Sequence, residues 1–431
     1  MSLLIAKIAG AWLVAILCGM PLYASMGLAA FAFAYLAGGF PLSIISQKLV
    51  QGVNSFPLVA APIFILMGNI LTAARINDKI VAFATALVGW LRGGYAHASI
   101  LASMIFAGMV GSAVADAAGV GAIEIKSMKR VGYRAETAAS ITAAAATIGP
   151  IIPPSLPMVI YGVAADVSIG RLFLAGFVPG ILMGLSLMVM VALIAKREGF
   201  GRQPFGGFGL IWSTFVDGIW ALLAPVILLA GMFSGIFTPT EAAAVAACYA
   251  LFLGFVVYRT LEWRMLPGIL ADTVETVGLV LILVMAAGAL GWCLSISRVP
   301  QTLTPAIVET IKNPLVFLLV CNLVLLAVGC FMELLAAMLI LIPILVPAAI
   351  SFGIDPVHFG VMMILNLILG TIHPPIGVVL FITSRIAGIS FETMSRAILP
   401  WLVPLLVVLA LVTVWPALTL WLPNLVMGAG K

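Results

Sequence analysis

The segments TIGPIIPPSLPMVIYG (Thr147–Gly162) and GTIHPPIG (Gly370–Gly377) each place two consecutive prolines inside a long apolar stretch. Proline has no backbone N–H to donate and its ring bars a helix from continuing. Inside a bilayer, such irregular backbone is tolerated only where protein buries it or where it lines a wet cavity. We therefore predict two helices broken at Pro153-Pro154 and at Pro374-Pro375. The pair of breaks is typical of a membrane transporter.

The composition indicates that lipid covers most of the chain. Apolar residues make up 64% of it and charged residues only 8%, whereas soluble domains carry about 25% charged residues. The net charge of +5 is too small to indicate a nucleic-acid partner. The five cysteines and three histidines show no metal-ligand spacing. No P-loop and no catalytic constellation is present in the sequence, so we expect a transporter rather than an enzyme.

A spanning helix needs about 20 mostly apolar residues, and the sequence offers twelve apolar stretches by this criterion. The N-terminal one has a single early charge, Lys7, and no cleavage site, so we expect an uncleaved span. Simple spans are predicted near 3–20, 23–40, 54–74, 173–195, 217–236, 239–258, 268–295 and 398–422. Interrupted stretches are predicted at 97–126, 136–168, 315–350 and 357–387.

The landmarks repeat along the chain. A shift of 221 residues carries Pro153-Pro154 onto Pro374-Pro375, and a shift of 218 carries Gly111 onto Gly329. The alternative is coincidence, since Gly and Pro are common in membrane helices. If the stretches broken at Gly111 and Gly329 are re-entrant hairpins, each half has five crossings. An odd number inverts the second half, as in many secondary transporters, and gives about ten spans in all.

Basic residues test this arrangement, because cytoplasmic loops are enriched in Lys and Arg. With the N-terminus outside, the inside loops hold all but six of the 20 basic residues, which favours N- and C-termini on the periplasmic side. The six outside are Lys7, Lys48, Arg171, Arg298, Lys312 and Lys431. The amphipathic segments 76–94 and 298–312 precede the hairpins. We interpret them as interfacial helices, with ordinary loops as the alternative.

The breaks provide polar backbone in the middle of the membrane. Carbonyls around Thr147–Ile151 lose their helical partners because prolines follow, and we expect the same of Gly370–His373. Free carbonyls suit a hard cation such as Na⁺. At the hairpin tips, the helix N-termini that follow Gly111 and Gly329 offer unpaired N–H groups, which suit an anion.

Two acids, Asp116 and Glu333, sit beside these tips. A carboxylate at the centre of a spanning helix costs about 2.5–3.5 kcal/mol on insertion scales, so such an acid is a functional candidate. The alternative is an acid satisfied at a hairpin tip near water. We expect a role in ion binding, proton relay or positioning of a gate.

Small hydroxyls accompany the breaks at Ser112, Ser155 and Thr371. Each taken alone is typical of a packed or back-bonded residue, but together they are candidate ligands. His373 has three interpretations: a substrate contact, a proton-linked switch, or a histidine bonded to freed carbonyls. The last is favoured.

Four segments resemble the large membrane subunit of tripartite ATP-independent periplasmic (TRAP) transporters. They are FAGMVGSAVADAAGVGAIEIKSMKRVGY (Phe106–Tyr133), TIGPIIPPSLPMVIYG, SFPLVAAPIFILMGNIL (Ser55–Leu71), and the segment Gly353–Ser390 that contains GTIHPPIG. The resemblance covers nearly the whole chain. It implies a Na⁺-coupled importer of an organic acid, such as a C4-dicarboxylate or sialic acid, in the bacterial cytoplasmic membrane.

The resemblance also implies a periplasmic substrate-binding protein, a small four-helix membrane subunit, an elevator mechanism, two or more Na⁺ sites and no organic cofactor. The alternative is a stand-alone carboxylate carrier of the wider ion-transporter superfamily. Glu333 stands where the family more often has Asp, and His373 where a smaller residue is usual. The family's Na⁺ ligands match Gly111, Ser112, Gly149 and Pro150 in one half, and Gly329, Gly370 and His373 in the other. The candidate substrate-binding residues are Ser112, Asp116, Ser155 and Glu333.

These patterns divide the chain into scaffold and transport regions. Scaffold spans and the first arm helix are expected in 1–96, hairpin 1 and the first broken helix in 97–170, further scaffold in 171–297, the second arm in 298–314, hairpin 2 and the second broken helix in 315–390, and the final scaffold span in 391–431.

Overall fold

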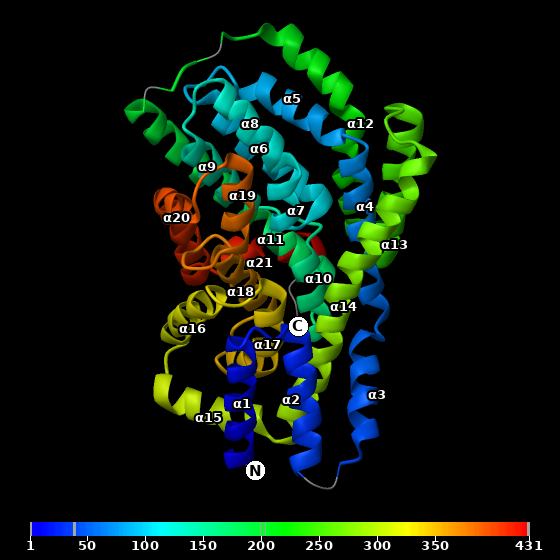
Figure 1. Cartoon of the computed structure of the whole chain (residues 1–431), viewed down its shortest axis with the longest axis vertical. Coiled ribbons are helices and arrows are strands. Elements are labelled where there is room, and N and C mark those ends of the chain that lie inside the picture. Colours follow the sequence, from blue (N-terminus) through cyan, green and yellow to red (C-terminus); the bar gives the residue numbers. More distant parts are fainter. Residues whose placement is uncertain (1, 38–39, 199, 203, 429–431) are drawn as a thin grey trace.

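In the computed structural model, which describes residues 2–37, 40–198, 200–202 and 204–428, every regular element is a helix (Figure 1). Seven of the described helices are long and apolar enough to cross a membrane, or eight if the bent pair α15–α16 forms one span. The predicted all-α polytopic fold is confirmed, while the number of ten spans stays a prediction.

The first half contains α1 (Ser2–Leu17), α2 (Leu22–Ala37), α3 (Leu42–Val53), the 3₁₀ turn η1 (Phe56–Val59), α4 (Ala60–Ala73), α5 (Ile76–Val88), α6 (Gly94–Val110), α7 (Ala113–Ala118), α8 (Val120–Arg130), α9 (Ala135–Ala146), α10 (Leu156–Ala164) and α11 (Ile169–Arg197). The second half contains α12 (Gly207–Phe233), α13 (Pro239–Phe252), the π turn η2 (Leu253–Val257), η3 (Trp263–Met265), α14 (Leu266–Ile296), α15 (Val299–Ile311), α16 (Pro314–Gly329), α17 (Leu334–Ser351), α18 (Pro356–Gly370), α19 (Val378–Ala387), α20 (Phe391–Val414) and α21 (Ala417–Met427).

Two hairpins form where the sequence predicts them. In the first, α6 ends at Gly111, Ser112 is extended, and the chain returns through α7 and α8 with a kink at Gly119. In the second, α16 and α17 are joined by Cys330–Glu333. The segments that precede the hairpins are the helices α5 and α15. These two helices lie at opposite ends of the molecule's long axis (Figure 1), as an inverted arrangement of the halves requires.

The two broken helices occupy the centre and interlock the halves. Every residue of α18 from Val357 onward is buried, and so are ten of the twelve residues of α9. Beyond each break, the second piece packs on the other half: α10 lies against α17 and α18, and α19 lies against α7, α8 and α9. The breaks therefore belong to one interlocked body rather than to two separate ones.

The predicted final span near 398–422 is wrong in its boundaries. The helix α20 ends at Val414, and a separate helix, α21, follows. Trp415 is not helical (φ −121°, ψ 85°), because the ring of a following proline disfavours the helical conformation and Pro416 follows it. The helix α21 then packs on α11, where Arg171 Nη2 donates to Asn424 Oδ1 at 2.6 Å. Lys431, one of the residues counted as outside, lies beyond the described residues.

The helix α3 was not predicted. The sequence LSIISQKLVQGV (Leu42–Val53) is amphipathic, which is the signal that could have identified it. It packs on α14, where glycines allow close contact: a Cβ on Gly52 would lie 3.2 Å from the Val284 carbonyl oxygen. Small residues at such a contact let two membrane helices approach closely.

A buried amide network joins α16, α18 and α20. Asn366 Nδ2 donates to Asn322 Oδ1 at 2.7 Å and to the Asn322 carbonyl at 3.0 Å, and Asn322 Nδ2 donates to Thr413 Oγ1 at 2.8 Å. All three side chains are buried. Because an apolar interior gives such groups no other partner, the network fixes how these helices sit against each other.

We predict that Asn366→Ala lowers the stability of the purified chain by about 1–3 kcal/mol, since it leaves Asn322 with an unmet acceptor. Thermal unfolding in detergent measures this. Combined with Asn322→Ala, the two losses should be non-additive by about 0.5–3 kcal/mol. Strict additivity would show that the two amides do not act as one network.

Candidate ion and substrate site

The tip of hairpin 1 lies directly on the first helix break. Gly111 has a φ of +61°, and a Cβ there would lie 2.3 Å from the Pro154 carbonyl oxygen. A Cβ on Gly149 would lie 3.7 Å from the Ser112 backbone nitrogen. The predicted first-half residues are thus brought together, and glycine is required at Gly111 both by its conformation and by the contact.

The hydroxyls at this site serve the backbone. Ser112 Oγ accepts from the Ala115 N–H at 3.4 Å and caps α7. Ser155 Oγ accepts from the Met158 N–H at 3.3 Å, caps α10, and donates to the Pro150 carbonyl at 2.5 Å. Ser155 and Pro150 therefore satisfy each other, which agrees with the back-bonded interpretation of the single hydroxyls.

The carbonyls before the first break are only partly freed. Among the described residues, no donor reaches the carbonyls of Thr147 and Gly149, as predicted. The expectation is wrong for Ile148, whose carbonyl accepts from the N–H groups of Ile151 and Ile152 at 3.0 and 3.1 Å, and for Pro150, whose carbonyl accepts from Ser155 Oγ. The reason is that the chain coils into a tight turn after α9 and does not open at once. The carbonyls of Thr147, Gly149 and Ile151 keep no donor among the described residues, and Gly149 lies beside Ser112.

The tip of hairpin 2 contacts the second break through paired glycines. A Cβ on Gly370 would lie 2.6 Å from the Gly329 carbonyl carbon and oxygen, and one on Gly329 would lie 3.2 Å from the Gly370 Cα. The two backbones touch where any side chain would separate them. The second-half residues Gly329 and Gly370 are therefore neighbours, as their first-half counterparts are.

The carbonyls of the second break are better satisfied than predicted. Gly370 accepts from the His373 N–H at 3.3 Å, and Thr371 accepts from the Val379 N–H at 3.1 Å. The expectation of free carbonyls is wrong for both, because Gly377 (φ +45°) turns the chain back and brings Val379 onto Thr371. Thr371 Oγ1 in turn donates to the Ile368 carbonyl at 2.6 Å.

His373 lies between two groups of its own half. Its Nδ1 is 2.5 Å from the Pro374 carbonyl oxygen and 3.2 Å from Cys330 Sγ. The backbone contact that the favoured interpretation expects is present, while a role of His373 in binding stays a prediction. Cys330 follows Gly329 as Ser112 follows Gly111, so a thiol replaces the first-half hydroxyl. The two breaks therefore differ in chemistry while sharing geometry.

The two tip acids are placed differently. Glu333 is the N-cap of α17, and its Oε2 accepts from the N–H groups of Leu335 and Ala336 at 2.8 and 3.1 Å. It therefore uses N–H groups that an anion would otherwise bind. Asp116 lies within α7 and is 3% exposed, and neither of its carboxylate oxygens has a hydrogen-bond partner among the described residues.

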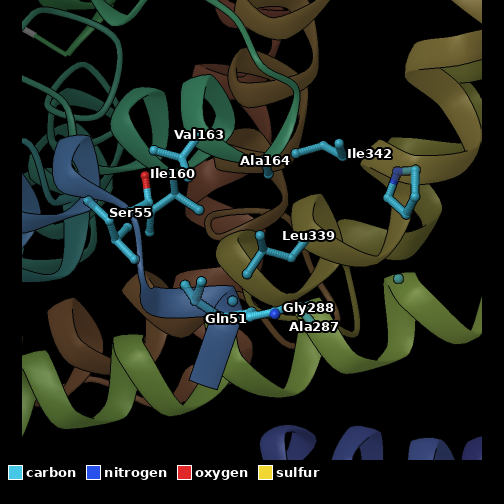
Figure 2. Close-up of a pocket in the computed structure, with 14 residues that line it drawn as sticks. Gln51, Ser55, Ile160, Val163, Ala164, Ala287, Gly288, Leu339 and Ile342 are labelled. Atoms are coloured by element: carbon cyan, nitrogen blue, oxygen red, sulfur yellow. The ribbon is translucent and has the colours of Figure 1, made fainter. Parts of the chain in front are cut away.

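A cavity of about 360 Å³ lies between α3 and α14 on one side and α10 and α17 on the other (Figure 2). Gln51 and Ser55 supply polar side chains, while Val163 and Leu339 are among the apolar ones. None of the predicted site residues lines it. The cavity separates the predicted scaffold from the predicted transport region. The sequence did not predict this cavity, because it did not predict α3.

The sequence of the chain decides its family. A family model described as "Tripartite ATP-independent periplasmic transporter, DctM component" matches residues 9–418. The chain belongs to the TRAP transporter large-subunit family. This makes it a multi-pass membrane protein and confirms the resemblance seen in the sequence.

Relatives of this TRAP subunit include the sialic acid TRAP transporter large permease protein SiaM of Vibrio cholerae. It is 46% identical over 97% of this chain and 98% of its own. The 2,3-diketo-L-gulonate TRAP transporter large permease protein YiaN of Escherichia coli is 39% identical over 90% of this chain and 91% of its own.

A similar fold occurs in the crystal structure of the Alcanivorax borkumensis YdaH transporter. The TM-score is 0.61 at 16% identity, and the match covers 87% of this TRAP subunit and 88% of that chain. At this identity the likeness shows the fold alone.

We predict that Gly370→Ala sharply lowers the stability or yield of the subunit, because the added Cβ would overlap the Gly329 backbone. Gly268→Ala, where nothing lies within 4 Å of the added Cβ, is the control. It should leave thermal unfolding in detergent nearly unchanged. Equal effects of the two substitutions would show that the contact between tip and break is not tight.

Proposed function

We propose that this TRAP subunit carries an organic acid across the bacterial cytoplasmic membrane in a Na⁺-coupled import cycle. The observation that carries the proposal is the contact of each hairpin tip with a helix break, which at the first break sets free carbonyls beside a helix N-terminus capped by Ser112. Inverted halves with paired broken helices are the usual architecture of secondary transporters.

The substrate class rests on the relatives. Their names give sialic acid, C4-dicarboxylate, 2,3-diketo-L-gulonate and isethionate as cargo. All of these are organic acids that are anionic at neutral pH. The proposed cargo is therefore an organic anion, and the helix N-termini of α7 and α10 are the groups suited to hold its negative charge.

Na⁺ coupling is proposed from the first break. The carbonyls of Thr147 and Gly149 have no donor among the described residues, and Ser112 lies next to Gly149. Oxygen ligands of this kind suit a hard cation. At the second break the carbonyls of Gly370 and Thr371 already have donors, so the second Na⁺ site at Gly329, Gly370 and His373 is the weaker part of the proposal. A cation helps transport only if it binds one state of the cycle better than the other.

The proposed assembly includes a periplasmic substrate-binding protein and a small four-helix membrane subunit, with both termini of this chain on the periplasmic side. The family name, with its "tripartite" and "periplasmic", supports such an assembly. Many exposed apolar side chains, including Leu323 and Val274, provide the surface that lipid and a membrane partner would cover.

An elevator movement is proposed for the interlocked body of hairpins and broken helices. Its support is the cavity between α3 and α14 on one side and α10 and α17 on the other. Tightly packed interiors do not slide, whereas a gap between two bodies leaves room for movement.

We predict that Ser112→Ala, in the complex reconstituted with its partners, raises the Na⁺ concentration needed for half-maximal uptake several-fold. The loss of the hydroxyl removes a ligand and weakens the cap of α7. Ser186→Ala removes a hydroxyl that bonds only the Met183 carbonyl and serves as the control. An unchanged Na⁺ dependence for Ser112→Ala would remove the first break from the coupling site.

The elevator proposal is tested by cross-linking across the cavity. With the exposed Cys18 and Cys248 replaced, a short bifunctional thiol reagent on Ser55→Cys plus Val163→Cys should abolish uptake. The reason is that it ties the scaffold to the moving body. Uptake that survives full cross-linking would rule out movement along this surface.

The matched control for that experiment keeps both cysteines within the scaffold, at Gln51→Cys and Ala287→Cys, which line the same cavity. Cross-linking there should leave uptake intact.

Uptake by the chain alone in liposomes, without a binding protein, would favour the stand-alone carrier instead.

A further inference from the structure

The linker between α11 and α12 combines basic and exposed aromatic side chains, and the transport proposal assigns it no role. Its sequence over 196–212, KREGFGRQPFGGFGLIW, holds the cations Lys196, Arg197 and Arg202 and the single acid Glu198. All three cations are exposed, and none forms an ion pair with an acid among the described residues. The linker therefore presents a net positive charge.

Large aromatic side chains accompany this charge. Phe208 is 82% exposed and Trp212 is 68% exposed, and their spacing of four residues places them on one face of α12. Phe205 precedes them, and its ring lies 5.5 Å from that of Phe208 and 6.0 Å from that of Trp90, which follows α5. Exposed apolar groups gathered in this way mark an interaction surface, and aromatic rings are typical of the lipid headgroup region.

The linker is attached to the base of hairpin 1. The Phe200 ring stacks on the ring of the buried Tyr133, with 4.2 Å between centroids. The Gly93 N–H, at the corner between α5 and α6, donates to the Gly201 carbonyl at 3.4 Å. Arg92 precedes that corner, is exposed, and adds a fourth cation without an acidic partner in the described part of the chain. These contacts hold the linker against the start of hairpin 1.

The linker lies at the end of the molecule where α5 lies, opposite α15 (Figure 1). The opening turns of α12 pack on α5, with the Phe83 and Phe215 rings 5.7 Å apart. In the proposed orientation this end faces the cytoplasm, because most of the basic loops belong to it. The positive charge and the aromatic rings therefore meet the cytoplasmic leaflet.

Three occupants can be compared for this surface. A soluble phosphate would bind the cations but leave the Phe208 and Trp212 rings in water. A neutral lipid would cover the rings but leave the cations without a counter-charge. An anionic phospholipid meets both requirements, because its phosphate pairs with Arg and Lys and its acyl chains cover the rings. Basic segments next to a membrane attract such lipids.

We define the linker patch as the four cations together with the two most exposed rings of the linker: Arg92, Lys196, Arg197, Arg202, Phe208 and Trp212. We propose that the linker patch binds anionic phospholipid of the cytoplasmic leaflet. The bound lipid holds the linker at the membrane surface, and through the stack of Phe200 on Tyr133 it also holds the base of hairpin 1 there. The lipid composition of the leaflet thereby acts on the hairpin without contacting the candidate ion and substrate site.

Spin-labelled lipids test the patch in bilayers that hold the purified chain. We expect the chain to prefer labelled phosphatidylglycerol over labelled phosphatidylcholine of the same acyl chains by several-fold. The preference should fall when salt rises from about 0.05 M to about 0.5 M, because ions screen the cations. A preference that is absent, or that does not respond to salt, would overturn the proposal without any substitution.

A pair of charge variants locates the preference on the linker. Arg197→Gln with Arg202→Gln should lower it about threefold or more, because each cation near a membrane surface adds to the attraction. The matched control, Arg298→Gln with Lys312→Gln, removes the same charge from the two ends of α15 at the opposite end of the molecule. It should change the preference little. An equal loss in both variants would show a general effect of net charge and overturn the proposal.

Thermal unfolding in detergent tests the aromatic part. Phosphatidylglycerol should raise the unfolding temperature of the chain more than phosphatidylcholine or inorganic phosphate does at the same concentration. An equal rise with inorganic phosphate would identify a simple anion site instead. Phe208→Gln with Trp212→Gln keeps all four cations and should shrink the rise, and an unchanged rise would contradict the proposed role of the rings.

The proposed small membrane subunit is the other candidate to cover this surface. If it does, Arg197→Gln with Arg202→Gln would lose co-purification with that subunit and keep its full lipid preference, which would overturn the proposal. None of these measurements involves uptake. Their failure would leave the proposed transport function standing, and a failed uptake experiment would leave the linker patch standing.

Discussion

The structure depends on one constraint: a backbone group that loses its helical partner inside a membrane must find another one. The two Pro-Pro sequences create such groups at the centre of the molecule, and the hairpin tips cover them. The tips approach the breaks closely because glycines lie at both contacts. Gly111 lies against the Pro154 carbonyl, and Gly370 lies against the Gly329 backbone. Each hairpin tip therefore depends on the helix break that it contacts, and each break depends on its tip. The interlocking of α10 and α19 with the opposite half follows from holding both pairs in one body.

The pairs share this geometry but not its chemistry. In the first half two serines cap the helices beside the break, and three carbonyls keep no donor among the described residues. In the second half Cys330 occupies the place of the first serine, and the carbonyls of Gly370 and Thr371 are satisfied within the loop. A shared backbone geometry does not oblige the side chains of the two halves to bind the same ion. The first break is the more polar of the two.

The landmarks that break a helix could be predicted from the sequence, because Pro and Gly act locally. Both breaks, both hairpins and the two arm helices were found in this way. What depends on tertiary contacts was missed. The carbonyl of Ile148 accepts hydrogen bonds within a turn that no sequence pattern predicts. Val379 reaches Thr371 only because Gly377 turns the chain. The helix α3 is short and amphipathic, so a criterion that requires a long apolar stretch does not identify it.

The residue at the N-cap position determines which partners each tip acid has. In hairpin 2 the acid itself is the N-cap, so the Glu333 carboxylate accepts hydrogen bonds from the N–H groups of α17. In hairpin 1 the N-cap is Ser112, and the acid stands four residues later within the helix. Because the Ser112 hydroxyl caps α7, Asp116 does not take the cap position and lies within the helix. The acid that the repeat would treat as equivalent to Glu333 is therefore left buried, with no hydrogen-bond partner among the described residues.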